Sequence, residues 1–196
     1  DLQPLRAQLA ASAHIGRRLR SQLDDVDLIH IYTQNAGLLL TDVMQDIPSV
    51  VSLDTTNVRN AFRLPYRHPT RFTERMLAPT IALERRVFEA ASMVVANSLW
   101  AAGSLRDHYE VCDEKLEVLP FGITSPHPTT ANPADPPRIV FLGRQFERKG
   151  GPVLLEAWRR FVSDRSELVI VTHDPLPPEP GVRIIHDLDQ GDDRLW

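Results

Sequence analysis

The chain has 196 residues, of which 42% are hydrophobic and 24% are charged, proportions that are ordinary for a globular protein. Its 22 basic and 26 acidic side chains give a net charge of -4, which argues against the basic excess of a nucleic-acid-binding protein. With one cysteine, Cys112, no intrachain disulfide can form, and we expect a reducing, cytoplasmic environment.

The first 56 residues predict two helices and two strands. Leucines recur near helical spacing between Leu5 and Leu23 and predict an amphipathic helix. Residues 26–35 and 47–56 are short, apolar, β-branched stretches that end in polar residues, so each predicts a strand. The stretch 36–45 between them predicts a helix. His30 lies inside the first strand, which favours a packed core histidine over a ligand.

The next predicted elements reach residue 123. They are a loop rich in Arg and Pro to about residue 69, a helix over 71–91, a strand over 92–98, a helix over 99–109 and a strand over 115–123. Pro79 either kinks the first of these helices or begins a second segment of it. Ser98 is well placed to cap the second helix.

A change in composition then divides the chain. Residues 124–137 contain five prolines and no large apolar residue, which indicates a linker. After it the alternation resumes with a strand over 138–143, a loop over 144–151, a helix over 152–164, and strands over 167–172 and 182–188. Strands that alternate with helices predict parallel β-α-β units, here with helices on both sheet faces. We therefore predict an α/β fold of two Rossmann-like, doubly wound lobes, over residues 1–123 and 138–196.

The segment from Arg138 to Trp158 carries the clearest chemical pattern. Its strand ends at Gly143, its loop contains Arg144 and Lys149, and Gly150 precedes a predicted helix. Free N–H groups and a partial positive charge at a helix start suit an anion such as a diphosphate. The pattern is neither the dinucleotide fingerprint nor a Walker A loop. From the residues alone, anion binding and a solvated basic loop are equally supported.

This segment, "RIVFLGRQFERKGGPVLLEAW", resembles the opening of the donor lobe in family 4 (group 1) glycosyltransferases of the GT-B fold. Four earlier segments resemble the family's acceptor lobe and occur in the family's order: "VDLIHIYTQNAGLLL", "IPSVVSLDTT", "ALERRVFEAASMVVANSLWAAGSLRDHY" and "KLEVLPFGI". The resemblance implies a hexosyl-type transferase that uses a nucleotide-diphosphate sugar, with retention, and a saccharide, lipid or other small-molecule acceptor. It implies no cofactor and no essential metal.

The resemblance also implies the site residues. Arg144 and Lys149, flanked by Gly143 and Gly150, would contact the donor diphosphate. Asp54 stands where many members have a His near the reacting sugar. It suits either a catalytic role, in which it accepts a hydrogen bond from a sugar hydroxyl or acts as a base, or a cap on the following turn. Apart from the resemblance, ligands of open parallel sheets bind at the carboxyl ends of the strands, so polar residues and glycines there are also expected to line the cleft: Thr33, Gln34, Asn97, Gly122 and His173, the last with a turn role equally open.

Other interpretations remain open. An epimerase of the same fold, or a non-catalytic nucleotide-sugar-binding module, fits the same lobes. We expect both lobes to be incomplete, since the family's Gly-rich loop and glutamate pair are not found, and we expect this chain alone to be inactive. Four arginines, Arg63, Arg67, Arg71 and Arg75, form either a solvated helix face or a contact with an anionic acceptor or the inner membrane face.

Overall fold

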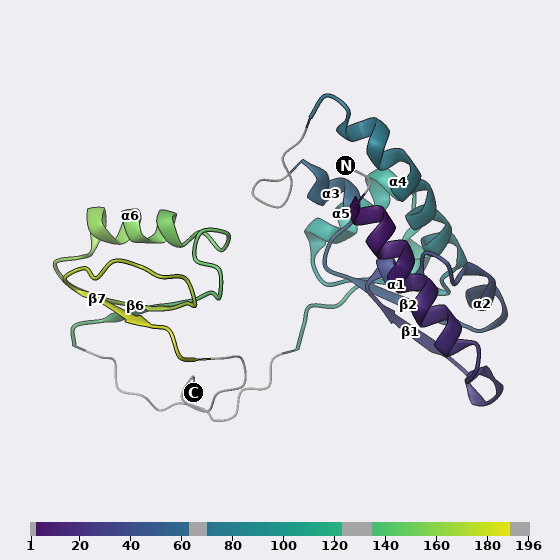
Figure 1. The fold of residues 1–196 in the computed structure, drawn as a ribbon, viewed down its shortest axis with the longest axis horizontal. Helices are drawn as coiled ribbons and strands as arrows, with labels where there is room; N and C mark the ends of the chain where they lie inside the picture. The colour runs from purple at the N-terminus through teal and green to yellow at the C-terminus, as the bar shows by residue number, and fades with distance from the viewer. Residues whose placement is uncertain (1–2, 63–69, 123–134, 189–196) are drawn as a thin grey trace. The chain divides into compact units, whose positions relative to one another are not determined.

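The computed structural model describes residues 3–62, 70–122 and 135–188. It separates into two compact units, Asp1–Gly122 and Ile123–Trp196 (Figure 1). Most of the predicted linker lies outside the described residues, as do Arg63 and Arg67.

The first unit is built on a four-stranded parallel sheet with the strand order β1-β2-β3-β4. The strands are β1 (Ile29–Tyr32), β2 (Ser49–Leu53), β3 (Met93–Ala96) and β4 (Leu116–Val118). In the register between the first two strands, Tyr32 lies opposite Ser52. The residues that follow Tyr32 and Leu53 therefore emerge at the same edge of the sheet.

In the described part of this unit, α1 and η1 precede the sheet, and the other helices follow its strands. The α-helices are α1 (Gln3–Leu19), α2 (Thr41–Asp46), α3 (Asn57–Ala61), α4 (Thr73–Ala90) and α5 (Leu99–Tyr109). The 3-10 helices are η1 (Leu23–Asp25), η2 (Gln34–Gly37) and η3 (Asp113–Lys115). Ser98 caps α5 as predicted, since its Oγ accepts the Ala101 N–H at 3.2 Å.

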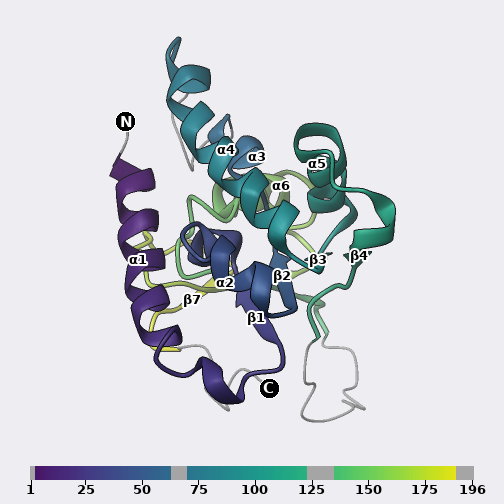
Figure 2. The ribbon, with the colours of Figure 1, turned by 90° about the vertical axis from the view of Figure 1, so that its right-hand side faces the viewer.

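The core of this unit lies between one face of the sheet and the helices. Val51, Leu53 and Val94 are fully buried beneath side chains of α2, α4 and α5. Figure 2 looks onto these helices, with α2 and α4 in front of β1 and β2. The other face is more open: Tyr32 is 52% exposed and Met93 is 39% exposed. In the described residues, helices therefore cover one face of this sheet rather than both.

The second unit is a smaller parallel sheet with the order β5-β6-β7 and one α-helix in its described part. Its elements are β5 (Arg138–Leu142), α6 (Gly151–Phe161), β6 (Glu167–Val171) and β7 (Val182–Ile185). Phe146, Trp158, Leu168 and Ile170 form its core. The predicted α/β class with parallel sheets and Rossmann-like units is confirmed.

Some local predictions were wrong. Residues 36–45 do not form one helix, because η2 ends at Gly37 and α2 begins at Thr41. The predicted loop after β2 contains α3, which Thr56 caps. Of the two alternatives left open for Pro79, the start of a second segment is excluded, because Pro79 lies inside the single helix α4. His30 is exposed rather than packed in the core, and its Nε2 lies 2.8 Å from Ser52 Oγ.

No helix in the described ranges has the length and apolar character that a membrane crossing requires.

Candidate functional site

A small polar pocket of about 100 Å³ lies where β1 and β2 end. It is lined by Thr33, Gln34, Asn35, Asp54, Thr55, Asn57 and Asn60. The parallel pairing of β1 with β2 explains the convergence, because it brings the turn into η2 beside the turn into α3. Three predicted site residues, Thr33, Gln34 and Asp54, therefore meet in one place.

The lining of this pocket has a distinct chemical character. It contributes four amide side chains, two threonine hydroxyls and one carboxylate, and it includes no Lys or Arg. Amides and hydroxyls both donate and accept hydrogen bonds, whereas a carboxylate accepts them. Such a surface suits a neutral ligand with several hydroxyl groups. It does not suit a phosphate, which would meet the charge of Asp54 without a compensating cation.

A buried carboxylate, Glu84 of α4, lies behind the pocket and is 0% exposed. Its Oε1 accepts hydrogen bonds from Gln34 Nε2 at 2.7 Å, Asn57 Nδ2 at 2.9 Å and the Asn57 backbone N–H at 3.2 Å. Its Oε2 accepts a hydrogen bond from the Tyr109 hydroxyl of α5. Burial raises the pKa of Glu84, and these four donors oppose that rise.

The same buried environment changes the pKa of Tyr109. Burial, followed by the neighbouring charge of Glu84, raises the pKa of the Tyr109 hydroxyl well above its ordinary value. Tyr109 therefore keeps its proton and remains a hydrogen-bond donor to Glu84 near neutral pH. Its ring also packs edge-to-face on Phe88, with centroids 5.0 Å apart.

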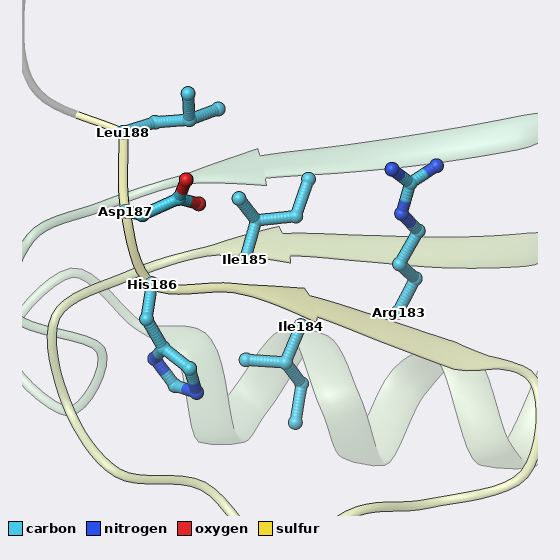
Figure 3. Close-up of a pocket in the computed structure, with 6 residues that line it drawn as sticks. All are labelled: Arg183, Ile184, Ile185, His186, Asp187 and Leu188. Atoms are coloured by element: carbon cyan, nitrogen blue, oxygen red, sulfur yellow. The ribbon is translucent and has the colours of Figure 1, made fainter.

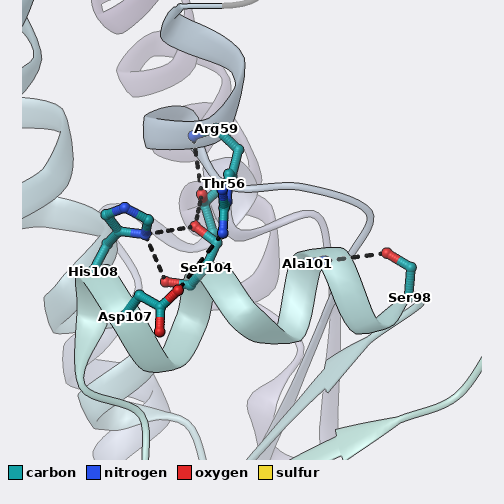
Figure 4. Close-up of polar contacts among 7 residues, drawn as sticks. All are labelled: Thr56, Arg59, Ser98, Ala101, Ser104, Asp107 and His108. Atoms are coloured by element: carbon teal, nitrogen blue, oxygen red, sulfur yellow. Dashed lines mark hydrogen bonds and ion pairs between the residues drawn. The ribbon is translucent and has the colours of Figure 1, made fainter.

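A second polar cluster connects α3 to α5 (Figure 4). Thr56 Oγ1 lies 2.7 Å from Ser104 Oγ, and Ser104 Oγ lies 3.2 Å from His108 Nδ1. Arg59 adds an ion pair with Asp107 at 3.7 Å. Although Ser104 and His108 resemble a nucleophile and its base, Ser104 is 0% exposed. The cluster therefore holds two helices together rather than acting on a substrate.

In the second unit, the predicted diphosphate loop follows β5. Arg144 and Lys149 are exposed, and neither forms an ion pair within residues 3–62, 70–122 and 135–188. Gly150 caps α6 in the left-handed region, with φ of 84°. A Cβ on Gly143 would lie 3.2 Å from Lys149 Cβ, so the start and end of the loop approach closely.

The backbone of this loop is already engaged. The Gly150 N–H donates to Glu147 O at 3.2 Å, and the Gly151 N–H donates to Phe146 O at 2.9 Å. Phe146 packs so tightly on Gly151 that a Cβ there would lie 2.2 Å from the ring. The Phe146 N–H in turn donates to Asp174 Oδ2 at 2.7 Å. In this conformation the loop offers an anion its two exposed side chains more readily than these backbone amides.

The remaining predicted positions lie elsewhere. Asn97 is half-buried and donates its backbone N–H to Leu53 O at 3.1 Å, but it does not line the pocket. Gly122 is exposed and likewise outside the pocket lining. His173 belongs to the second unit, where its backbone N–H donates to Arg144 O at 3.3 Å. This bond places His173 beside the loop after β5.

A larger hollow of about 510 Å³ runs along β7 and its continuation. Six consecutive residues line it, from Arg183 to Leu188. Figure 3 shows that the side chains from Arg183 to His186 alternate between the two faces of the strand instead of converging. His186 Nδ1 lies 3.0 Å from Thr172 O. Among the described residues, this arrangement is that of a sheet edge and not of a built site.

Several contributors to the first pocket were not predicted from the sequence. Asn57 and Asn60 were overlooked because the stretch after β2 was interpreted as a loop. Glu84 left a readable signal: it shares the helical spacing of the buried residues Leu77 and Val87 on α4. A carboxylate on such an apolar stripe needs buried donors, and Gln34 and Asn57 provide them.

Comparisons with known proteins agree with the resemblance seen in the sequence. The family model described as Glycosyltransferase Family 4 matches residues 2–125, which include all of the pocket and Glu84. A search of the curated proteins found no match. In the described ranges, no group of three or more His, Cys, Asp or Glu side chains is arranged to hold a metal ion.

Proposed function

We propose a donor side and an acceptor side for this chain, which belongs to Glycosyltransferase Family 4. The activity of the family is glycosyl transfer, so a sugar donor and an acceptor are its substrates. The acceptor is assigned to the polar pocket of the first unit and a nucleotide-diphosphate sugar to the loop after β5. The full-length protein transfers a hexosyl-type sugar with retention of configuration, as the resemblance of this chain to the family implies.

The observation that carries this proposal is the contrast in charge between the two places. The pocket after β1 and β2 is lined by amides, hydroxyls and Asp54, with no cation. The loop after β5 presents Arg144 and Lys149, both exposed. A neutral acceptor hydroxyl matches the first surface, and a diphosphate matches the second.

The donor side acts by electrostatics. As the bond between sugar and diphosphate breaks, negative charge develops on the leaving diphosphate. Arg144 and Lys149 would stabilise that charge in the transition state more than in the ground state. Neither side chain has another ion-pair partner in the described part of the chain, so both charges remain available to a ligand.

The acceptor side acts by orientation. Asp54 is exposed at the pocket and would accept a hydrogen bond from the reacting hydroxyl. The amides and threonines around it would hold neighbouring hydroxyls of the acceptor. Because these side chains come from two adjacent turns, their positions are set by the pairing of β1 with β2.

The test is donor turnover by Arg144→Ala and Lys149→Ala in the full-length protein. Each change is expected to raise the donor KM and lower kcat, by roughly tenfold or more in kcat/KM. Arg148→Ala is the matched control, because Arg148 lies in the same loop and donates its Nε–H to Gln145. Unchanged donor turnover in both test variants, or an equal loss in the control, would contradict the donor assignment.

A further inference from the structure

Two pocket-lining side chains depend on one buried carboxylate. Gln34 is 2% exposed and Asn57 is 4% exposed, so neither amide can turn freely in solvent. Both donate to the same oxygen of Glu84, which comes from α4, a different element from the turns that carry the amides. Within the described residues, Glu84 has no ion-pair partner. Its partners are neutral donors.

The orientation of the Gln34 amide follows without ambiguity from its contacts. Gln34 Nε2 lies 2.7 Å from Glu84 Oε1 and 3.1 Å from Thr55 O, and both of these atoms accept hydrogen bonds. Only the NH₂ end can occupy that place, so the amide cannot be flipped. Gln34 Oε1 is consequently left without a donor among the described residues.

Burial of Gln34 Oε1 without a hydrogen-bond donor is unfavourable in free energy. A carbonyl oxygen that is removed from water without gaining a hydrogen bond destabilises the folded chain. The chain bears that cost because Glu84 and Thr55 fix the opposite end of the amide.

We propose that Glu84 is a positioning residue of the acceptor site, which fixes the amides of Gln34 and Asn57 so that the pocket receives a hydroxyl-bearing acceptor. This inference rests on the proposed function, since it takes the pocket as the acceptor side. Glu84 itself touches no substrate, because it is fully buried. It acts through the two amides that line the pocket.

The structure supplies a matched control on the other oxygen of the same carboxylate. Tyr109 donates to Glu84 Oε2, whereas Gln34 and Asn57 donate to Oε1. Tyr109→Phe therefore removes a buried hydrogen bond of Glu84 without removing a donor from the pocket. A purely structural role predicts that substitutions on both sides impair the enzyme alike, whereas a positioning role predicts that they differ.

The test is steady-state kinetics of the full-length protein with both substrates varied. Glu84→Leu and Glu84→Asp are expected to raise the acceptor KM by roughly tenfold and a few-fold, respectively, with the donor KM unchanged. Glu84→Asp retains the carboxylate but moves it back by one methylene. It therefore tests whether the position of the carboxylate matters, even if Glu84→Leu does not fold. Glu84→Gln should restore a near-normal acceptor KM, since its amide oxygen can accept the same bonds.

Tyr109→Phe should lower stability and leave the acceptor KM unchanged. The inference is overturned if Tyr109→Phe raises the acceptor KM as much as Glu84→Asp does, or if Glu84→Asp leaves it unchanged. Asn60→Ala separates this failure from that of the proposed function, because Asn60 lines the pocket without bonding Glu84. An acceptor KM insensitive to Asn60→Ala would refute the acceptor assignment itself, and the role of Glu84 with it.

Discussion

The two candidate sites of this chain are organised in opposite ways. The pocket after β1 and β2 is held from behind by Glu84, whose hydrogen bonds fix Gln34 and Asn57 before any ligand arrives. The loop after β5 places Arg144 and Lys149 in solvent, and its glycine amides are engaged within the loop. The first is thus suited to orient a neutral substrate through short hydrogen bonds, and the second to attract an anion through charge.

The largest expected effect comes from the charge in the pocket. Asp54→Ala removes an exposed carboxylate that would accept a hydrogen bond from the acceptor hydroxyl. Since hydrogen bonds to charged groups contribute about 1.5–3 kcal/mol, kcat/KM for the acceptor should fall by roughly 10- to 100-fold. Nucleoside diphosphate binding, measured by calorimetry, should be unchanged. Weaker nucleoside diphosphate binding together with an unchanged acceptor KM would show that the two sites are assigned the wrong way round.

The next effect concerns the packing of the loop after β5. Gly151→Ala would place a Cβ 2.2 Å from the Phe146 ring, so the ring or the helix start has to shift. Overpacking of this kind costs about 1–3 kcal/mol, and we expect that loss in the second unit together with weaker nucleotide binding. Denaturant unfolding and nucleotide titration measure the two effects. Gly122→Ala is the control, because a Cβ at Gly122 meets nothing within 4 Å.

The loop after β5 was predicted from the sequence more completely than the pocket after β1 and β2. The loop after β5 was predicted directly, because Gly143, Arg144, Lys149 and Gly150 are consecutive or nearly so. The pocket was predicted only in part. Thr33, Gln34 and Asp54 were expected at the site because they follow strands, and ligands bind at the carboxyl ends of parallel strands.

The missing parts of the pocket depend on tertiary contacts. Asn57 belongs to a helix of five residues, too short to show a periodic pattern. Glu84 lies 50 residues from Gln34, and no local spacing connects them. His30 was misplaced because alternation alone does not tell which face of a strand is covered.

A smaller effect is expected from salt, which should change the donor KM more than the acceptor KM. Charges on exposed side chains are screened over about 10 Å at 0.1 M salt, whereas buried hydrogen bonds are little affected. Raising NaCl from about 0.05 M to about 0.5 M should therefore raise the donor KM by roughly three- to tenfold and leave the acceptor KM nearly constant. Equal sensitivity of both constants would show that the two sites do not differ in this way.

The smallest effect is the dependence of stability on pH. Because burial raises the pKa of Glu84, the folded chain retains this proton at pH values where the unfolded chain, with a pKa near 4.5, has lost it. The contribution of Glu84 to stability is thus full below pH 4.5 and declines as pH rises toward the folded value. Wild type should lose stability relative to Glu84→Gln over this range in urea unfolding. Parallel curves for the two proteins would contradict the raised pKa.

The most direct test of the division between the sites is a crossed measurement of both Michaelis constants. Asn60→Ala changes the pocket of the first unit, and Lys149→Ala changes the loop of the second. In the full-length protein, Asn60→Ala should raise only the acceptor KM and Lys149→Ala only the donor KM. If both substitutions raise the same constant, the assignment of acceptor and donor to separate sites is wrong.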